Sequence, residues 1–526
     1  MEANFTDLQG LLKDSKVYAD AGYLDTVNRA TFPTRTRSQA VVRAGSTADI
    51  RQLLAYCREK GYALYVISTG KNWGFGSRVP NADVEILLDL SDLNRIISYD
   101  PKFGTIRCEP GVTFRQVCHF LREQGDRHFL NAIGGHPDSS LIGNALERGD
   151  GAGPYAERAA YVCSAEVILA DGQTVSLGMG NVRYSKLEDL CGAGPGPDFQ
   201  PLFFQSNLGV VTKMTFWLCR KPDFFISFQF DLEASHPLGN VLDILKDLYD
   251  RRLMDAPVTF WNDYKQLTNS IQYPWSIQPD PPLERSAIRA ISNRYRSWYA
   301  FGGIYKDHPQ MAGLTASALF RSLKGHIARK GFWSVLSSDK MKRLARLRPL
   351  LRNTKYSLEA LFQKWENNPL LGWVEDRHIR SVYWRKKTPL PAEINPDQQS
   401  CGLLWHAFAV PFDGDTVAEV IRELERIIFG RGFEPVIAIL LWNNRYVRIF
   451  QQLIFDREAA GEDEKALLCH REIFDYLHQS GYSHQRLDIL NMGDADKLLR
   501  SGDLHERIKK ALDPDGILAP GRYFMP

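Results

Sequence analysis

The chain has 526 residues, which at about 150 residues per domain corresponds to about three or four domain-sized units. Its composition, 44% hydrophobic and 24% charged residues, is that of an ordinary globular protein and excludes a disordered or fibrous chain. The net charge is +3, from 65 lysines and arginines against 62 aspartates and glutamates, so charge gives no reason to expect a nucleic-acid partner.

Export, membrane and metal-binding patterns are missing from the sequence. The longest plainly apolar stretch, VIAILLW at residues 436–442, is far shorter than the roughly 20 residues that a bilayer requires. The first ten residues, MEANFTDLQG, lack the basic and apolar parts of a secretion signal. Eight scattered cysteines form no CxxC pair, which argues against a zinc site or a disulfide framework. We therefore expect a cytoplasmic protein with free thiols, no bound metal and no membrane contact.

The first part of the chain alternates predicted helices and strands. Thr47–Lys60 places apolar side chains at helical spacing and stops at Gly61. The β-rich apolar run ALYVIS at residues 63–68 predicts a strand that opens into a loop. Further strands are predicted at residues 85–90, 104–108, 165–170, 174–177 and 210–219, with Asp171 and Gly172 forming a hairpin turn.

The pattern changes after Pro222, which follows two charged residues and marks a predicted domain boundary. Residues 226–233 alternate apolar and polar side chains, as in a half-buried antiparallel strand. Later segments predict helices at residues 241–251 and 417–429 and strands at residues 403–410 and 435–442. Such a mixture indicates an α+β second domain that carries an antiparallel sheet.

A glycine-rich loop, STGKNWGFGS at residues 68–77, follows the strand predicted at residues 63–68. Its glycines allow successive backbone N–H groups to converge on an anion, because no Cβ intervenes. The loop suits a pyrophosphate, while an ordinary tight turn would use the same glycines. Its spacing matches neither a Rossmann fingerprint nor a Walker A motif.

Six segments in this order resemble the vanillyl-alcohol oxidase/p-cresol methylhydroxylase (PCMH) family of flavoproteins. They are TGKNWGFGS at residues 69–77, EPGVT at 109–113, GNALERG at 143–149, EVILADG at 166–172, QSNLGVVTK at 205–213 and DPDGILAPG at 513–521. The resemblance implies an α+β fold in which a PCMH-type FAD-binding domain is built from residues 1–222 and 481–526. Residues 223–480 would form an inserted α+β cap domain with an antiparallel sheet over the flavin.

The same resemblance assigns the cofactor, FAD, and the residues that hold it. Backbone N–H groups of residues 68–72 would bind the pyrophosphate, and Arg522 stands where the family has a basic residue near the cofactor. The implied FAD-binding residues are Ser68, Thr69, Gly70, Lys71, Asn72, Gly74, Gly76, Gly135, Gly143, Asn144, Gly149, Gly209, Val210 and Arg522.

The reaction centre departs from that of the family's phenol oxidases, which hold a phenolate with two tyrosines and an arginine. Phe75 and Gln485 stand in place of the tyrosines, and only Arg486 matches. We therefore expect a substrate other than a simple para-phenol bound as phenolate. Arg486 would hold an electronegative group, or else pair with a buried acid such as Asp488. Gln485 would bond an amide or carbonyl, or else lie at the surface.

The sequence leaves several candidates for the residue that accepts the substrate proton. The family's carboxylate maps to Gly135, and Asp138 and His136 are neighbours that could substitute for it. His406 lies in the cap segment LLWHAF, residues 403–408, which matches the segment that can carry a covalent flavin ligand. Because Leu403 falls at the linking position, we expect dissociable FAD. His406 is the alternative covalent ligand, a candidate general base, or a core residue.

Three further residues are assigned to the substrate. Trp405 matches an aromatic wall over the substrate or else packs in the core, His484 flanks the Gln485-Arg486 pair, and Phe75 belongs to the glycine loop. The implied function is an FAD-dependent oxidoreductase, oxidase or dehydrogenase, in specialised metabolism. It would pass a hydride from a benzylic, alcohol or amine C–H of a small organic substrate to flavin N5. Arg486 would hold the substrate, and His406 or Asp138 would take the proton.

Two alternative functions remain at this point. One is oxidative cyclisation or desaturation of a carrier-bound intermediate, and the other is flavin binding without turnover. Residues 321–355 contain eleven lysines and arginines against one acid, Asp339. Such a run usually forms a solvated helix face, but it could dock an acidic carrier protein or a neighbouring subunit. We expect a homodimer.

Overall fold

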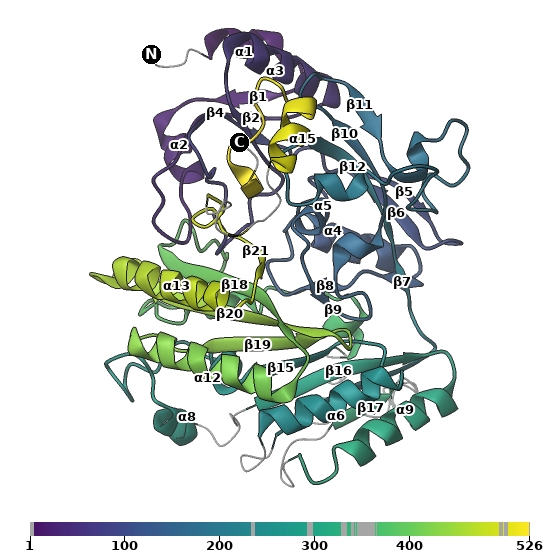
Figure 1. The fold of residues 1–526 in the computed structure, drawn as a ribbon, viewed down its shortest axis with the longest axis vertical. Helices are drawn as coiled ribbons and strands as arrows, with labels where there is room; N and C mark the ends of the chain where they lie inside the picture. The colour runs from purple at the N-terminus through teal and green to yellow at the C-terminus, as the bar shows by residue number, and fades with distance from the viewer. Residues whose placement is uncertain are drawn as a thin grey trace, which may run out of the picture.

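The computed structural model describes residues 5–232, 237–291, 298–327, 334–337, 341, 343, 363, 365–493, 498 and 503–524. Figure 1 shows two regions, an upper one that contains the early elements and the C-terminal segment, and a lower one built on a large sheet. Most of the basic run at residues 321–355 lies outside the described residues, so its docking role stays a prediction.

The upper region contains two sheets. A four-stranded sheet has the order β1-β2-β4-β3, and a five-stranded antiparallel sheet has the order β11-β10-β12-β6-β5. The strands of the first sheet are β1 (Lys16–Tyr18), β2 (Ser38–Arg43), β3 (Leu64–Ile67) and β4 (Val84–Asp89). Those of the second sheet are β5 (Ile96–Asp100), β6 (Thr105–Cys108), β10 (Val162–Ile168), β11 (Thr174–Ser176) and β12 (Val210–Trp217).

Helices and short strand pairs complete this region. The helices are α1 (Thr6–Leu11), α2 (Ala21–Val27), α3 (Thr47–Lys60), α4 (Phe114–Glu123), α5 (Leu141–Leu146) and α15 (Leu504–Leu512). The paired short strands are β7 (His128–Phe129) with β13 (Cys219–Arg220), and β8 (Ala132–Ile133) with β9 (Gly151–Ala152). The C-terminal segment joins β3, because Leu64 N donates to Ile517 O and Ala519 N donates to Leu64 O, both at 2.7 Å.

The lower region, here called the cap, is an eight-stranded sheet of order β17-β14-β16-β15-β19-β20-β18-β21. Its strands are β14 (Phe224–Asp231), β15 (Val258–Asn262), β16 (Trp298–Lys306), β17 (Ser334–Ser337), β18 (Cys401–Pro411), β19 (Val436–Leu441), β20 (Tyr446–Asp456) and β21 (His484–Arg486). Its helices are α6 (Leu238–Asp250), α7 (Asp263–Thr268), α8 (Arg285–Ile291), α9 (Pro309–Ser322), α12 (Gly414–Gly430) and α13 (Glu462–Gln479).

The local expectations for the regular elements are confirmed within a few residues. Helix α3 begins after Ser46, whose side chain accepts a hydrogen bond from Asp49 N, and ends at Gly61 in the left-handed conformation, with φ of 67°. One prediction was wrong. Residues 210–219 were expected to form one strand, but the chain leaves the five-stranded sheet after Trp217, and Cys219 pairs with β7. Leu218 N donates to Gly104 O at this point, which redirects the chain.

The two faces of β18 meet different surroundings because side chains alternate along a strand. Leu404 and Phe408 belong to the apolar core that lies under α6, α12 and α13, and His406 is fully buried on the same side of the strand. Trp405 and Ala407 face the opposite way, toward the upper region. Figure 1 shows β21 at the junction of the two regions.

Three histidine side chains form a hydrogen-bonded chain on the core-facing side of β18. His406 Nδ1 is 2.9 Å from His484 Nε2, and His406 Nε2 is 2.8 Å from His470 Nδ1. His470 Nε2 then lies 3.1 Å from an oxygen of Asp488. These contacts link β18, β21, α13 and the segment after β21. Burial lowers the pKa of His406 well below its ordinary value, and burial lowers the pKa of His484 to about 3.

Because buried His406 stays neutral where the unfolded chain takes up a proton, folding stability falls as pH drops below about 6.5. The loss is about 1.4 kcal/mol per pH unit for each such histidine. His406→Gln is therefore expected to lose less unfolding free energy between pH 7.5 and pH 5.5 than the parent protein, measured by urea unfolding. The control His478→Gln, at an exposed position on α13, should keep the parent slope. Equal slopes for all three proteins would contradict the assignment.

Candidate active site

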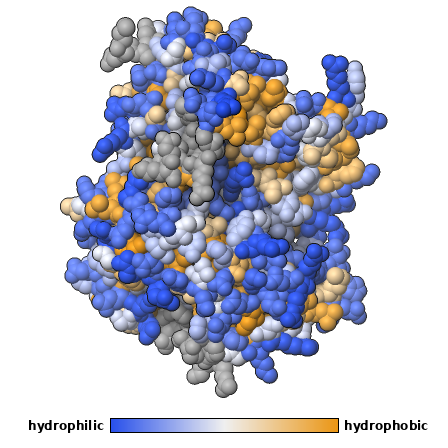
Figure 2. All heavy atoms as spheres, viewed as in Figure 1, coloured by the Kyte–Doolittle hydropathy of each residue, from blue (hydrophilic) through white to orange (hydrophobic). Residues whose placement is uncertain are grey.

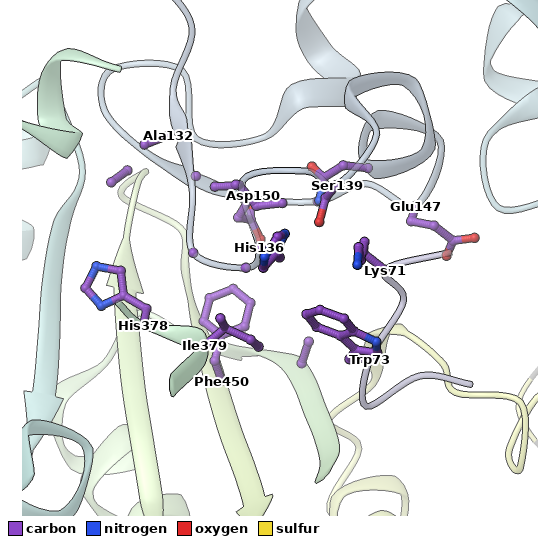
Figure 3. Close-up of a pocket in the computed structure, with 18 of the residues that line it drawn as sticks. Lys71, Trp73, Ala132, His136, Ser139, Glu147, Asp150, His378, Ile379 and Phe450 are labelled. Atoms are coloured by element: carbon purple, nitrogen blue, oxygen red, sulfur yellow. The ribbon is translucent and has the colours of Figure 1, made fainter. Parts of the chain in front are cut away.

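A cavity of about 1450 Å³ lies between the glycine loop and the cap sheet. Small-molecule sites commonly occupy about 300–1,000 Å³, so this cavity has room for a dinucleotide together with a substrate. Figure 3 shows its two sides, with His378 and Phe450 on the cap and Lys71, His136 and Glu147 on the loops opposite.

On the loop side of the cavity, the backbone is arranged so that a ligand can approach it closely. Gly70 has a φ of 68°, in the left-handed region that favours glycine. Thr69 Oγ1 accepts a hydrogen bond from Ser140 N at 3.0 Å, which docks the loop against the start of α5. A Cβ on Gly143 would lie 3.1 Å from Ser68 Oγ, and one on Gly149 would lie 2.2 Å from Asn144 Oδ1. Gly143 and Gly149 therefore allow α5 and the turn after it to pack closely against Ser68 and Asn144, two residues that line the cavity.

Most of the residues expected to hold FAD line this cavity, and three do not. Gly74, Gly76 and Val210 lie outside its lining. A Cβ on Gly74 would meet the Trp405 ring at 2.1 Å, and a Cβ on Gly76 would meet Ile489 at 2.7 Å. These two glycines therefore allow the loop to pack on the cap, while Val210 is a buried core residue of β12.

A buried carboxylate that sequence reasoning did not single out, Glu147, lines the cavity. Glu147 follows α5 within the GNALERG segment and pairs with Arg522. Its other oxygen accepts a hydrogen bond from the Tyr523 hydroxyl at 2.6 Å and lies 3.4 Å from Arg486 Nε. Burial would raise the pKa of Glu147, but Arg522 and Arg486 outweigh burial and hold it below its ordinary value. The sequence feature that could have pointed to Glu147 is its position within the GNALERG segment, which resembles the family.

Arg486 is held over the glycine loop. Its guanidinium lies 4.1 Å from the centre of the Phe75 ring and donates to Asn72 Oδ1. Its acidic neighbour is Glu147, whereas Asp488, the partner considered from the sequence, pairs with His470. Arg486 and Gln485 both line the cavity.

Of the expected proton acceptors, His406 and Asp138 lie outside the cavity lining, whereas His136 belongs to it. His406 and His484 lie behind β18 and bond each other, so neither of them lines the cavity. Asp138 also lies outside the lining and pairs with Arg115 at 2.6 Å near the surface. Its neighbour His136 does line the cavity, with its ring 5.5 Å from that of Trp73.

The cap side is aromatic and carries a few polar groups. Trp405 lies on it, as expected for a wall over the substrate. The other aromatic and polar side chains on this side include Trp261, Tyr299, Phe301, Phe450, Lys265, Asn269 and His378. They come from separate strands, helices and loops of the cap, so no local sequence signal could have grouped them.

Several other features bear on the kind of protein. All eight cysteines are free. Within the described part of the chain, no cluster of three His, Cys, Asp or Glu side chains is arranged to hold a metal ion. Nor does any helix of that part combine the length and apolar character needed to cross a bilayer. The face shown in Figure 2 is mostly hydrophilic, with hydrophobic residues gathered at its upper right.

Comparison with known proteins agrees with the site. Residues 38–178 match the model of an FAD binding domain family. The chain is 36% identical to the 1'-carboxy-chondrochloren decarboxylase of Chondromyces crocatus over 529 residues, covering 99% of this chain and 97% of the relative. It is 25% identical to the flavoprotein subunit of 4-cresol dehydrogenase (hydroxylating) of Pseudomonas putida, covering 98% of this chain and 94% of the relative.

The fold matches a crystal structure of p-cresol methylhydroxylase with substrate bound. The TM-score is 0.85 at 23% identity, covering 98% of this chain and 95% of that chain. The match confirms the predicted α+β fold, with a PCMH-type FAD-binding domain and a cap that carries an antiparallel sheet. FAD is the cofactor that the cavity holds. The chain therefore belongs to the vanillyl-alcohol oxidase/p-cresol methylhydroxylase family of FAD-dependent oxidoreductases.

Proposed function

We propose that this protein removes a hydride from an activated C–H bond of a small aromatic substrate. The bond is benzylic, or belongs to the carbon that carries an alcohol or an amine. Bound FAD supplies the hydride acceptor, at N5 of its ring system. The observation that carries the proposal is a continuous cavity that joins the glycine loop to the aromatic face of the cap, with Arg486 among its lining residues.

The cap face suits a flat apolar substrate. The Trp261 and Phe301 rings meet edge to face with centres 4.8 Å apart, and Tyr299 lies 5.7 Å from Phe301. These rings and Trp405 line the cavity from the cap side. Aromatic walls of this kind hold a substrate ring in a fixed orientation and exclude water from the reacting carbon.

The loop side argues against a phenolate. Phe75 has no hydroxyl to donate, and its face is covered by the Arg486 guanidinium. Arg486 also shares the charge of Glu147, so it is a partly neutralised cation. Such a group can orient an electronegative atom of the substrate, and no hydroxyl at the Phe75 position is present to share a phenolate oxygen with it.

A second candidate is oxidation coupled to loss of CO₂, supported by the 36% identical relative that is named a decarboxylase. In this reaction a hydride leaves the carbon next to the one that bears the carboxylate. The C–CO₂ bond breaks, its electron pair forms a C=C bond, and CO₂ departs. No proton is released, so no base is required. The reaction therefore does not depend on the proton acceptors considered from the sequence, of which His406 and Asp138 lie outside the cavity lining and His136 lies in it.

The reaction is tested by mixing the FAD-loaded protein anaerobically with 4-methoxybenzyl alcohol, 4-methoxybenzylamine and 3-(4-methoxyphenyl)propanoate. At least one compound is expected to bleach the visible flavin absorbance, and 4-hydroxybenzyl alcohol should be no faster than its methoxy counterpart. Release of 4-methoxystyrene and CO₂ from the propanoate would favour the second candidate. Bleaching by the phenol alone would contradict the argument against a phenolate. A flavin that dithionite reduces and none of these compounds bleaches would indicate binding without turnover.

FAD is expected to dissociate from the protein. Leu403 is a leucine at the linking position, and His406 is fully buried with both ring nitrogens bonded to other histidines. Acid precipitation of the purified protein should therefore leave the yellow colour in the supernatant. A yellow pellet would contradict the expectation and direct attention to His136, which lines the cavity.

Arg486→Ala is expected to lower kcat/KM at least tenfold for the substrate found above, because it removes a charged donor at the cavity. Arg251→Ala, at an exposed position where α6 ends, is the matched control and should leave kcat/KM unchanged. The FAD content of both variants is measured alongside. Unchanged kcat/KM in an FAD-loaded Arg486→Ala protein would remove this residue from the site.

A further inference from the structure

We infer that Lys265 binds a carboxylate group of the substrate, one that the product retains. The inference rests on the proposed function in one respect, because the carboxylate belongs to the molecule that is oxidised. It adds a chemical class of substrate, an aromatic or otherwise apolar compound with one anionic end, and a residue that selects it.

Lys265 is a buried cation that faces the cavity. It lies on α7, its residue is 7% exposed, and it contributes to the cavity lining. Its Nζ donates to Gln452 Oε1 at 2.5 Å and lies 6.0 Å from the centre of the Trp405 ring. Gln452 is neutral, so its amide oxygen satisfies one donor without balancing the charge. Burial lowers the pKa of this ammonium to about 7.

The other buried lysines show how this chain normally treats such a charge. Lys386 and Lys509 are the remaining buried lysines among the described residues. Lys386 Nζ lies 2.6 Å from Asp456, and Lys509 Nζ lies 2.6 Å from Asp513. Within the described ranges, no carboxylate lies at ion-pair distance from Lys265 Nζ. A buried charge without a counter-ion is costly, and an anionic ligand would offset that cost.

The arginines that line the cavity near the glycine loop already have carboxylate partners. Arg486 and Arg522 both lie beside Glu147, and Arg148 pairs with Glu157 at 3.6 Å. Their charges are therefore partly balanced before any ligand enters. An incoming carboxylate gains most at a buried cation that has no carboxylate of its own, and Lys265 is the most buried such cation in the lining among the described residues.

Two neutral polar groups of the cavity lining add to the same end. Both side-chain amide atoms of Asn269, which ends α7, are buried without a hydrogen-bond partner. His378 Nδ1 is likewise buried and unbonded, and its ring packs edge-on against Trp261. Burial, Lys265 and Arg377 lower the pKa of His378 to about 4, so its imidazole is neutral near pH 7. Figure 3 places His378 across the cavity from Lys71.

These groups belong to the polar part of the cap-side lining, which also contains Gln229, Asp231, Gln266 and Glu375 beside the aromatic side chains. A carboxylate at Lys265 would receive a charge-assisted hydrogen bond. The Asn269 amide lies one helical turn further along α7, and the positive charge of Lys265 contributes to the lowered pKa of His378. The substrate's apolar body would then lie along Trp405 and Trp261. One ammonium balances one carboxylate.

An ion pair with Lys265 favours a carboxylate that stays on the product over one that leaves as CO₂. Pairing with Lys265 stabilises the anion in the bound substrate, and that stabilisation is lost as the group becomes neutral CO₂. Binding of this kind therefore slows the departure of the group that it holds. The carboxylate at Lys265 is one that remains on the product, including when a different carboxylate is expelled.

The test compares 4-ethylbenzoate with its neutral analogue 4-ethylbenzamide, using the FAD-loaded protein at constant ionic strength. The carboxylate of 4-ethylbenzoate is on the ring, away from the benzylic C–H, so it would stay on the product. Binding is followed by the change in the flavin absorption spectrum and by calorimetry, neither of which requires turnover. The acid is expected to bind the parent protein at least tenfold more tightly than the amide. Lys265→Met, which keeps an apolar chain of similar length, should remove that preference without changing the affinity for the amide. Lys246→Met, on the exposed side of α6, is the matched control.

Equal affinity of the parent protein for the acid and the amide would overturn the inference, and so would a Lys265→Met protein that keeps the preference. The parent comparison stands even if the variant folds poorly, and FAD content reports on folding. Failure of the proposed function has a different signature. In that case the acid is preferred through Lys265, yet no candidate substrate bleaches the flavin.

Discussion

The site depends on one buried carboxylate, Glu147, and the groups that surround it. It joins three segments that are far apart in the chain, the end of α5, strand β21 through Arg486, and the C-terminal segment through Arg522 and Tyr523. A lone buried carboxylate would be strongly destabilising, but two guanidiniums and a hydroxyl offset its desolvation. Arg486 then reaches Asn72 and Phe75, so the same cluster holds the glycine loop against β21.

The two faces of strand β18 have different roles: one packs in the core of the cap, and the other lines the cavity. His406 and its imidazole neighbours bind β18 to β21 and α13 on the buried side. Trp405 on the other side reaches the glycine loop, where its backbone N–H donates to Gly74 O at 3.3 Å. The histidines therefore act on the site indirectly, by positioning the strand that carries Arg486 and the strand that carries Trp405.

Charge is distributed unevenly along the cavity. Beside the glycine loop, the single carboxylate of Glu147 lies next to both Arg486 and Arg522, so it offsets part of their positive charge. On the cap side, Lys265 has an amide as its partner, and its ammonium lies 6.0 Å from the centre of the Trp405 ring. A molecule with an apolar body and one anionic end would complement this arrangement better than a neutral or wholly polar compound.

The sequence by itself determined the elements, the family and the cofactor. Local spacing and capping specify α3 and the glycine loop, and short ordered segments carry the family resemblance. Alternation along residues 403–410 shows that the strand has two faces, but it does not say which face meets the cofactor, so His406 was expected at a place that Trp405 and Ala407 occupy. The partner of Arg486 and the isolation of Lys265 were likewise decided by tertiary structure. Both depend on side chains that lie far apart in the chain and meet only when the sheet order, the register and the C-terminal return are complete.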